Sequence, residues 1–503
     1  MKTRYILMIF SLACALGMQA SARDTARVEH HSLWNQVELA SACQNPAIHG
    51  VAYLHSYSEL YIQLDHLHQT APFVQEKGTG FLLGEAKVET FLKLNNRSSV
   101  WGAASYMTGK QYKVRWNSTS DYDLLYPYIL ADTLGGDTKR ERYSFHGGYS
   151  TRLNQILLGA EALFRAEHEY RDVDPRMRGV VTDLTVKLGS GYETLGYRYA
   201  LGVDVNVYKQ TNDVDFYREL GVIPEYQMTG LGTEYSRFSG DKRTLYYKGG
   251  GFGLMLSADP LRNNGVYGRA KVWNRQYKRM VADLNSTPIT QLFVDAADIT
   301  VGWKRKGRHL LSLDGNFLLV KRSGDENIIG KSSSQYYPVI GKLTMYKNTQ
   351  LDVNLKVLYG LNAPVNTWNV QAKAGVLSNK ENYVYPERKM DDTKVYGSVE
   401  GQWMKMLNKQ LGLTVSMDAS YYANVDDHIL MPFANMTASF ADMIRYKYRF
   451  TKADYTLFDA KLRADYALPH SQIGLFAEVA GGLAFCSEKE HKTHIHLALG
   501  VSF

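Results

Sequence analysis

The feature that most constrains this chain is a strict alternation of apolar and polar side chains, which recurs in many segments. In one segment the odd positions are all apolar, namely Tyr197, Tyr199, Leu201, Val203, Val205 and Val207, with Arg198, Asp204 and Asn206 among the residues between them. Similar segments begin at Leu351, Leu411 and Phe458. Because successive side chains of a β-strand point to opposite faces, each segment predicts a strand with one apolar and one polar face.

The length of these segments distinguishes two kinds of all-β protein. Each apolar face covers about 9 to 12 residues, the length that a tilted strand needs to cross the hydrocarbon layer of a membrane. A soluble β-sandwich also alternates, but its strands have about five or six residues. Several segments end in Tyr, which favours the membrane–water interface. The sequence therefore predicts an all-β fold, a closed antiparallel transmembrane β-barrel.

Short and long connections between the segments alternate along most of the chain. Short ones stand at 95–98, 152–154, 305–307, 347–349, 407–409 and 469–471, and long ones at 112–141, 212–242, 279–291, 322–335 and 423–453. Short periplasmic turns and long extracellular loops are typical of outer-membrane barrels. Counting the segments predicts about 18 strands, with 16 to 20 allowed and the region 376–392 ambiguous.

The chain begins with the pattern of a cleaved signal peptide over residues 1–22. Lys2 and Arg4 precede an apolar run, and small residues end it at Ala20–Ala22. Residues 23–55 are then expected to form an N-terminal periplasmic or lumen-plugging segment, and residues 56–503 the barrel. We expect the mature protein in the outer membrane of a Gram-negative cell, in contact with its lipid and lipopolysaccharide.

The last segment alternates up to the final residue. Its apolar positions are Ile495, Leu497, Leu499, Val501 and Phe503. This ending resembles the terminal signature by which the barrel assembly machinery recognises outer-membrane barrels. The resemblance implies that machinery as a partner.

A short motif precedes the first strand, formed by Asn45, Pro46 and Ala47. It resembles the N-terminal segment of FadL-like outer-membrane transporters, which import hydrophobic compounds through a barrel that this segment plugs. The whole chain resembles a group of uncharacterised Bacteroidota outer-membrane barrels of similar length. The alternative for the motif is an ordinary turn, for which Asn-Pro is common. Residues 23–54 are too few for the large plug of a TonB-dependent receptor.

The polar faces predict what lines the lumen. Residues expected there include Arg198, Asp204, Asp352, Lys356, Asp459, Lys461, Arg463 and Asp465. Acidic and basic side chains are nearly equal in number, which predicts a wet lumen that ion pairs brace or that is weakly selective. The formal net charge of +8 comes without a basic block, so nucleic acid is not an expected partner.

Two groups of histidines are expected where the first and last strands meet at the extracellular rim. These rim histidines are His66, His68, His491, His494 and His496. Imidazole and the neighbouring carboxylates suit Zn, Cu or Ni, so a metal site is one interpretation and a polar rim the other. The alternation places the first two outward and the last two inward, which argues against one site. No cofactor is otherwise predicted.

The loop from Met431 to Phe450 is rich in Met, Phe and Tyr. A loop this apolar is expected to fold into the lumen as a constriction or to contact a partner. The alternative is simple packing on the mouth of the barrel.

These features favour a passive channel or transporter for an unknown small solute, with hydrophobic cargo as one option. The alternative is a non-transporting accessory or structural barrel that works with another envelope protein. A barrel-type membrane enzyme is less favoured, because the common local catalytic motifs are absent from the sequence.

Overall fold

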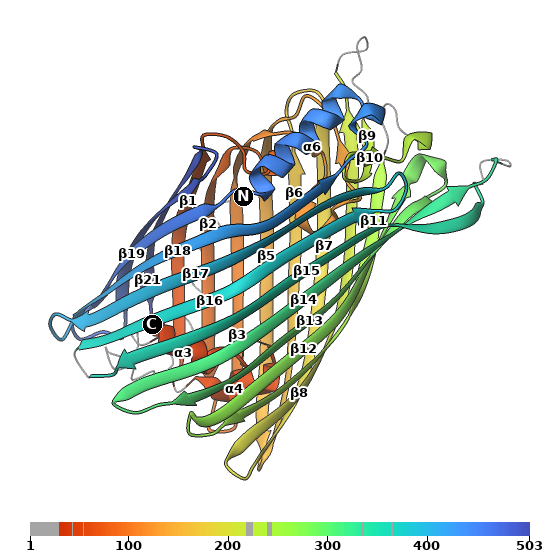
Figure 1. The fold of residues 1–503 in the computed structure, drawn as a ribbon. Helices are drawn as coiled ribbons and strands as arrows, with labels where there is room; N and C mark the ends of the chain where they lie inside the picture. Colours follow the sequence, from red (N-terminus) through yellow and green to blue (C-terminus); the bar gives the residue numbers. More distant parts are fainter. Residues whose placement is uncertain are drawn as a thin grey trace.

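The protein forms a closed antiparallel β-barrel of 18 strands (Figure 1). The computed structural model describes residues 30–42, 44–53, 55–217, 225–238, 244–332, 337–363 and 366–503, so the predicted signal peptide lies outside the described residues. Neighbouring strands pair in chain order, and β21 (His491–Ser502) closes the ring against β1 (Tyr57–Gln69). The predicted fold class and strand number are confirmed.

The other strands of the ring are β2 (Gly80–Lys93), β3 (Ser98–Val114), β5 (Gly136–Leu153), β6 (Ile156–Tyr170), β7 (Arg176–Thr194), β8 (Tyr197–Asp215), β11 (Leu245–Pro260), β12 (Asn264–Val281), β13 (Thr287–Arg305), β14 (His309–Ile329), β15 (Val339–Leu361), β16 (Asn366–Tyr383), β17 (Arg388–Met406), β18 (Leu411–Leu430), β19 (Tyr455–Ala467) and β20 (Gly474–Cys486). The ambiguous region 376–392 holds the end of β16, a tight turn and the start of β17.

One predicted turn, at 347–349, is wrong. These residues lie inside the 23-residue strand β15, where Lys347 pairs with Ser323 on one side and Asn382 on the other. The strands continue beyond the bilayer on the side of the long connections. There the outer face meets water, and the inward Asn348 is buried and hydrogen-bonded to Asn379. A run of polar residues therefore no longer indicates a turn.

The outer face of the barrel is apolar. Ile62, Val205 and Leu355 point outward with 63%, 57% and 64% of their surfaces exposed, in line with many other large apolar side chains. Such a surface is stable in contact with lipid tails. The alternate positions face the lumen. None of the helices in the described part of the chain is long and apolar enough to cross a membrane.

The start of β1, the end of β21 and the short turns lie at the same end of the barrel. We call this end periplasmic, by the convention for outer-membrane barrels. Two helices, α3 (Leu33–Leu39) and α4 (Pro46–Ala52), lie near this end (Figure 1). The other, extracellular end carries the long connections.

The extracellular connections contain several short elements. These are η1 (Gln75–Lys77), α5 (Tyr122–Leu125), β4 (Leu130–Ala131), β9 (Tyr226–Gly230), β10 (Thr233–Glu234), η2 (Ser236–Phe238), η3 (Ala282–Leu284), η4 (Phe433–Asn435) and α6 (Ala438–Thr451). Strands β4, β9 and β10 form a separate small sheet, and α6 lies across this end of the barrel (Figure 1).

Candidate functional site: a lumen occupied at both ends

The wall of the lumen carries charged side chains from its middle to its periplasmic end. The residues predicted to face it do so, and most of them have ion-pair or hydrogen-bond partners. Arg463 lies 2.6 Å from Glu59 and 3.0 Å from Asp465, and Asp204 is almost fully buried in an ion pair with Arg275. Such pairs brace the wall from strand to strand.

Four of the five remaining predicted lumen residues are also held by neighbours. Lys356 lies 3.4 Å from Asp314, Lys461 lies 3.8 Å from Glu478, Arg198 lies 2.8 Å from Glu193, and Asp352 accepts a 2.7 Å hydrogen bond from Tyr396.

One row of carboxylates differs from this pattern. Glu400, Asp418 and Asp459 lie directly opposite one another on β17, β18 and β19. Like charges at such positions repel each other unless water or counter-ions screen them. Glu400 and Asp418 are half-buried and Asp459 is exposed. This part of the lumen is therefore wet and is not a packed core.

The extracellular end of the lumen is filled by an apolar core, which we call the extracellular core. The side chains that the connections contribute to it include Trp116, Leu125, Tyr128, Ile129, Leu130, Met228, Leu231, Phe440, Met443 and Ile444. They pack against inward side chains of the wall, among them Val181, Tyr208 and Tyr346. The connections thus fold into the mouth of the barrel.

Buried polar groups fix the connection between β3 and β5 to the wall. Asp121 receives two hydrogen bonds from Arg165, of 2.7 and 2.6 Å. Asp132 lies 2.9 Å from Arg171, and both side chains are fully enclosed. Because a charge left unpaired in such a place is costly, these pairs hold the connection in one position.

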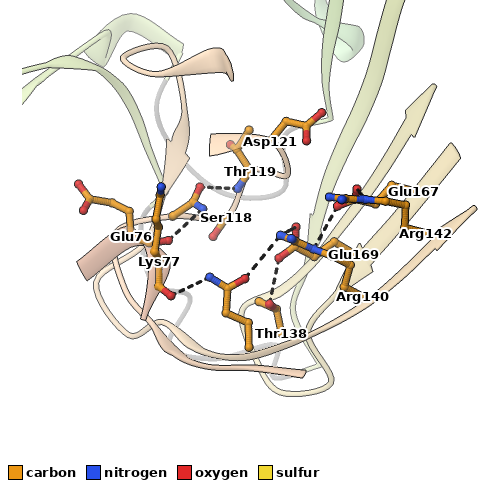
Figure 2. Close-up of polar contacts among 12 residues, drawn as sticks. Glu76, Lys77, Ser118, Thr119, Asp121, Thr138, Arg140, Arg142, Glu167 and Glu169 are labelled. Carbon is orange, nitrogen blue, oxygen red and sulfur yellow. Dashed lines mark hydrogen bonds and ion pairs between the residues drawn. The ribbon is translucent and has the colours of Figure 1, made fainter. Parts of the chain in front are cut away.

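The wall beside this connection carries a denser ion-pair network (Figure 2). Glu167 lies 3.1 Å from Arg140 and 2.6 Å from Arg142, and Glu169 lies 3.2 Å from Arg140. Figure 2 shows Arg140 and Arg142 directed at these carboxylates, with Thr138 also bound to Glu169. The arginines are therefore neutralised by the wall itself.

Helix α6 covers the extracellular core. Phe440 packs against Trp116 and Tyr226, with ring centroids 5.7 and 5.0 Å apart. Lys447 lies 2.9 Å from Glu381 of the wall and donates a 2.7 Å hydrogen bond to Tyr126. The Met431–Phe450 loop thus packs on the mouth and contributes side chains to the core.

A second carboxyl lies beneath this helix. Glu76 of η1 is buried, and burial raises the pKa of its carboxyl above the usual range, with the charge of Lys447 acting in the opposite direction. The ammonium group of Lys447 therefore interacts with a carboxyl group of the wall, Glu381, and with one of a neighbouring connection, Glu76.

The periplasmic end holds the N-terminal segment. Asn45 caps α4, and its side chain accepts a 2.9 Å hydrogen bond from the backbone N–H of Ala47. Pro46 occupies the first turn, where its missing N–H costs nothing. The Asn-Pro-Ala motif is therefore a helix start that is buried inside the barrel, and not a surface turn.

Glycines of the wall make room for this helix. A Cβ atom at Gly159 would lie 2.4 Å from the carbonyl carbon of Pro46, and one at Gly189 would lie 2.0 Å from Oδ1 of Asn45. Gly202 on β8 is also within contact distance of Asn45. These inward glycines on three neighbouring strands let the backbone of α4 approach the wall closely.

Helix α3 is held by fewer contacts. Leu33, Trp34 and Val37 pack on Leu310 and Leu358 of the wall. Hydrogen bonds and an ion pair add to this packing: the Leu33 N–H donates to Gln402 at 2.8 Å, and Lys306 lies 2.6 Å from Glu38.

Two half-buried histidines mark the N-terminal segment. His49 stacks on Trp101 at 4.3 Å, and His30 lies 4.4 Å from the ring of Tyr57. Burial lowers the pKa of each imidazole to about 4. The segment therefore docks with both rings neutral.

The rim histidines do not come together. His494 and His496 face the lumen, where they lie 3.4 and 2.8 Å from Asp65. His66 and His68 lie on the opposite face of the sheet. Among the residues that the structure describes, no three His, Cys, Asp or Glu side chains are placed to hold a metal ion.

The last strand keeps the predicted alternation. Ile495, Leu497 and Leu499 are exposed on the outer face, and Val501 and Phe503 continue the same side. Its role as an assembly signal stays a prediction.

Sequence reasoning missed two sets of residues. The extracellular core joins connections that are far apart in the chain and show no periodicity, so nothing local predicts it. The glycines that receive α4 carry a usable signal, since Gly159, Gly189 and Gly202 are all on inward positions of consecutive strands.

A family model described as "Family of unknown function (DUF6850)" matches residues 46–503. No curated protein matches the chain. Among solved structures, the chain is similar to BauA, the ferric preacinetobactin receptor from Acinetobacter baumannii, with 9% identity over 89% of this chain and 80% of that one and a TM-score of 0.43. It is also similar to the outer membrane protein OpdK from Pseudomonas aeruginosa, with 10% identity over 89% of this chain and 99% of that one and a TM-score of 0.35. These values are too low to carry an argument about function.

Proposed function

We propose, for a chain that belongs to the family of unknown function DUF6850, that its barrel is a gated passage for small polar solutes across the outer membrane. The observation that carries the proposal is the wet, charged middle of the lumen between two closures. The closures are the extracellular core and the N-terminal segment. Each packs against the inner face of the wall through non-covalent contacts.

The composition of the lumen supports polar cargo over hydrophobic cargo. Half-buried charges such as Glu400 and Asp418 lie along the wall, and a hydrophobic solute would have to displace the water that solvates them. The hydrophobic cargo implied by the FadL-like motif has no comparable support in the middle of the lumen. At the periplasmic end, by contrast, aromatic rings line a cavity of about 110 Å³ beside His49.

A solute-flux assay tests the proposal. Liposomes that contain a variant in which residues 30–53 are deleted and the connections 117–133, 218–243 and 434–451 are replaced by short linkers should swell in small sugars and amino acids. Liposomes with the intact chain should swell far more slowly. Heat-modifiable migration on gels checks that the variant is folded. If the folded variant passes no solute, the barrel is not a passage, and the accessory role becomes the better account.

A further inference from the structure

The lipid-facing wall has a hollow with a volume of about 770 Å³. We call it the outer hollow. Its floor consists of small outward residues, namely Ser190, Ala258, Gly268 and Ala270. Its sides are large apolar residues, namely Tyr192, Tyr199, Leu201, Leu256, Ile299 and Val301.

The sheet register explains the hollow. Ala258 pairs with Tyr199 on one side and Gly268 on the other, and Ala270 pairs with Leu256 and Ile299. The small side chains thus lie together on β11 and β12, and the large side chains lie mostly on the flanking strands. A flat barrel wall would interdigitate evenly with lipid tails, whereas this one leaves a recess between the large side chains.

The periplasmic rim begins just beyond the hollow, since β13 continues for four residues from the lining residue Val301 to its end at Arg305. Arg305 at the end of β13 lies on the same outward face as Val301 and Ile299, and it pairs with Asn264. Arg262 stands in the adjoining turn between β11 and β12. Both arginines are exposed, and neither forms an ion pair with any residue in the described part of the chain.

The dimensions match one leaflet of a membrane. Six residues separate Ile299 from Arg305, or about 20 Å of strand at about 3.3 Å per residue. With a strand tilt of about 40° this stretch covers roughly 15 Å along the membrane normal, which is half of the hydrocarbon thickness. The two arginines then stand at the level of phosphate groups.

We propose that the outer hollow holds the acyl chains of one anionic phospholipid of the periplasmic leaflet, with its phosphate bound by Arg262 and Arg305. Two uncompensated guanidinium groups above an apolar recess fit a headgroup phosphate and its tails. The site is independent of the passage through the lumen. It would give the barrel a preference for a periplasmic leaflet that contains anionic phospholipid.

Native mass spectrometry of the detergent-purified full-length mature chain tests the proposal. The wild type should retain one phospholipid. The variant Ala258→Leu/Ala270→Leu, which fills the hollow, should lose it, and the matched variant Ala460→Leu, which enlarges an exposed outward residue on β19, should keep it. Heat-modifiable migration confirms that each variant is folded.

A titration separates the headgroup from the tails. Delipidated wild type should bind phosphatidylglycerol about ten-fold more tightly than phosphatidylcholine, and Arg262→Ala/Arg305→Ala should remove that preference. Equal lipid retention by wild type and filled variant would overturn the proposal. So would a wild type that carries no lipid, or a dimer that the filled variant turns into monomers, since a second copy would then cover the hollow.

Discussion

The segments that occupy the two ends of the lumen are held by different kinds of contact. At the extracellular end, side chains of several connections pack into one apolar core that also includes α6. At the periplasmic end, two seven-residue helices lie against wall glycines and a few apolar and polar groups. The free energy needed to detach a segment grows with the apolar surface that becomes exposed. The difference therefore indicates that the N-terminal segment is released more easily than the extracellular core.

The strongest test of the extracellular closure is Phe440→Asp. The substitution places a carboxylate in the core beside Trp116 and should weaken α6 docking by about 3–5 kcal/mol. Trypsin added outside intact cells should then cleave α6 at Arg445 and Lys447, which the wild type resists. The exposed Ser439→Asp on the same helix is the control. Equal cleavage of the two variants would mean that α6 does not depend on the core.

The periplasmic closure is tested by Gly159→Val. No side chain fits between β6 and the carbonyl of Pro46, so α4 must leave its place. Hydrogen exchange of residues 33–52 should become at least about ten-fold faster, a change of about 1.4 kcal/mol in docking. Gly401→Val is the matched control, because a Cβ there meets nothing within 4 Å. Unchanged exchange in Gly159→Val would show that the contact is unimportant.

Acid should release the N-terminal segment but leave the extracellular core in place. The docked pKa of His30 and of His49 is about 4, below the value of 6.5 for a free imidazole. Docking therefore has its full stability above pH 6.5 and loses it as the pH falls towards 4, by about ten-fold per pH unit for each histidine.

Hydrogen exchange of 33–52, corrected for its intrinsic pH dependence, measures this release between pH 7 and pH 5. Protease sensitivity of α6 should stay constant over the same range. In the variant His30→Phe/His49→Phe the exchange should be independent of pH. A pH dependence that survives in this variant would assign the release to other groups.

The smallest expected effect is that of Lys447→Met. The change removes the cation from Glu381 but retains most of the apolar stem, and Lys447 is only partly buried. The cost should be about 1–2 kcal/mol, because Glu381 still accepts a hydrogen bond from Tyr346. Tryptic cleavage after Arg445 should rise several-fold, and Lys447→Arg should restore resistance. If the methionine variant equals wild type, the ion pair contributes nothing to the closure.

The sequence predicted the barrel because lipid and water impose a local two-residue period, which Leu355 and Lys356 illustrate. It also predicted that His66 and His494 would lie on opposite faces. It failed at 347–349, where the wall extends into water and the period no longer distinguishes strand from turn.

The closures were harder to predict. Trp116, Met228 and Phe440 meet only because three connections fold into the same mouth, and long-range packing of this kind leaves no local pattern. The N-terminal motif indicated a plug only through resemblance. Its fit to Gly159 and Gly189 depends on the register of strands that are distant from it in the chain.

Planar-bilayer recording tests most directly whether a wet passage lies between two closures in series. The intact chain should be nearly silent. A variant that lacks residues 30–53, or one in which the connections 117–133, 218–243 and 434–451 are replaced by short linkers, should show at most brief openings. The double variant that combines both changes should give steady, discrete current steps. A correctly folded double variant that remains silent would contradict the account, because the middle of the lumen would then not conduct.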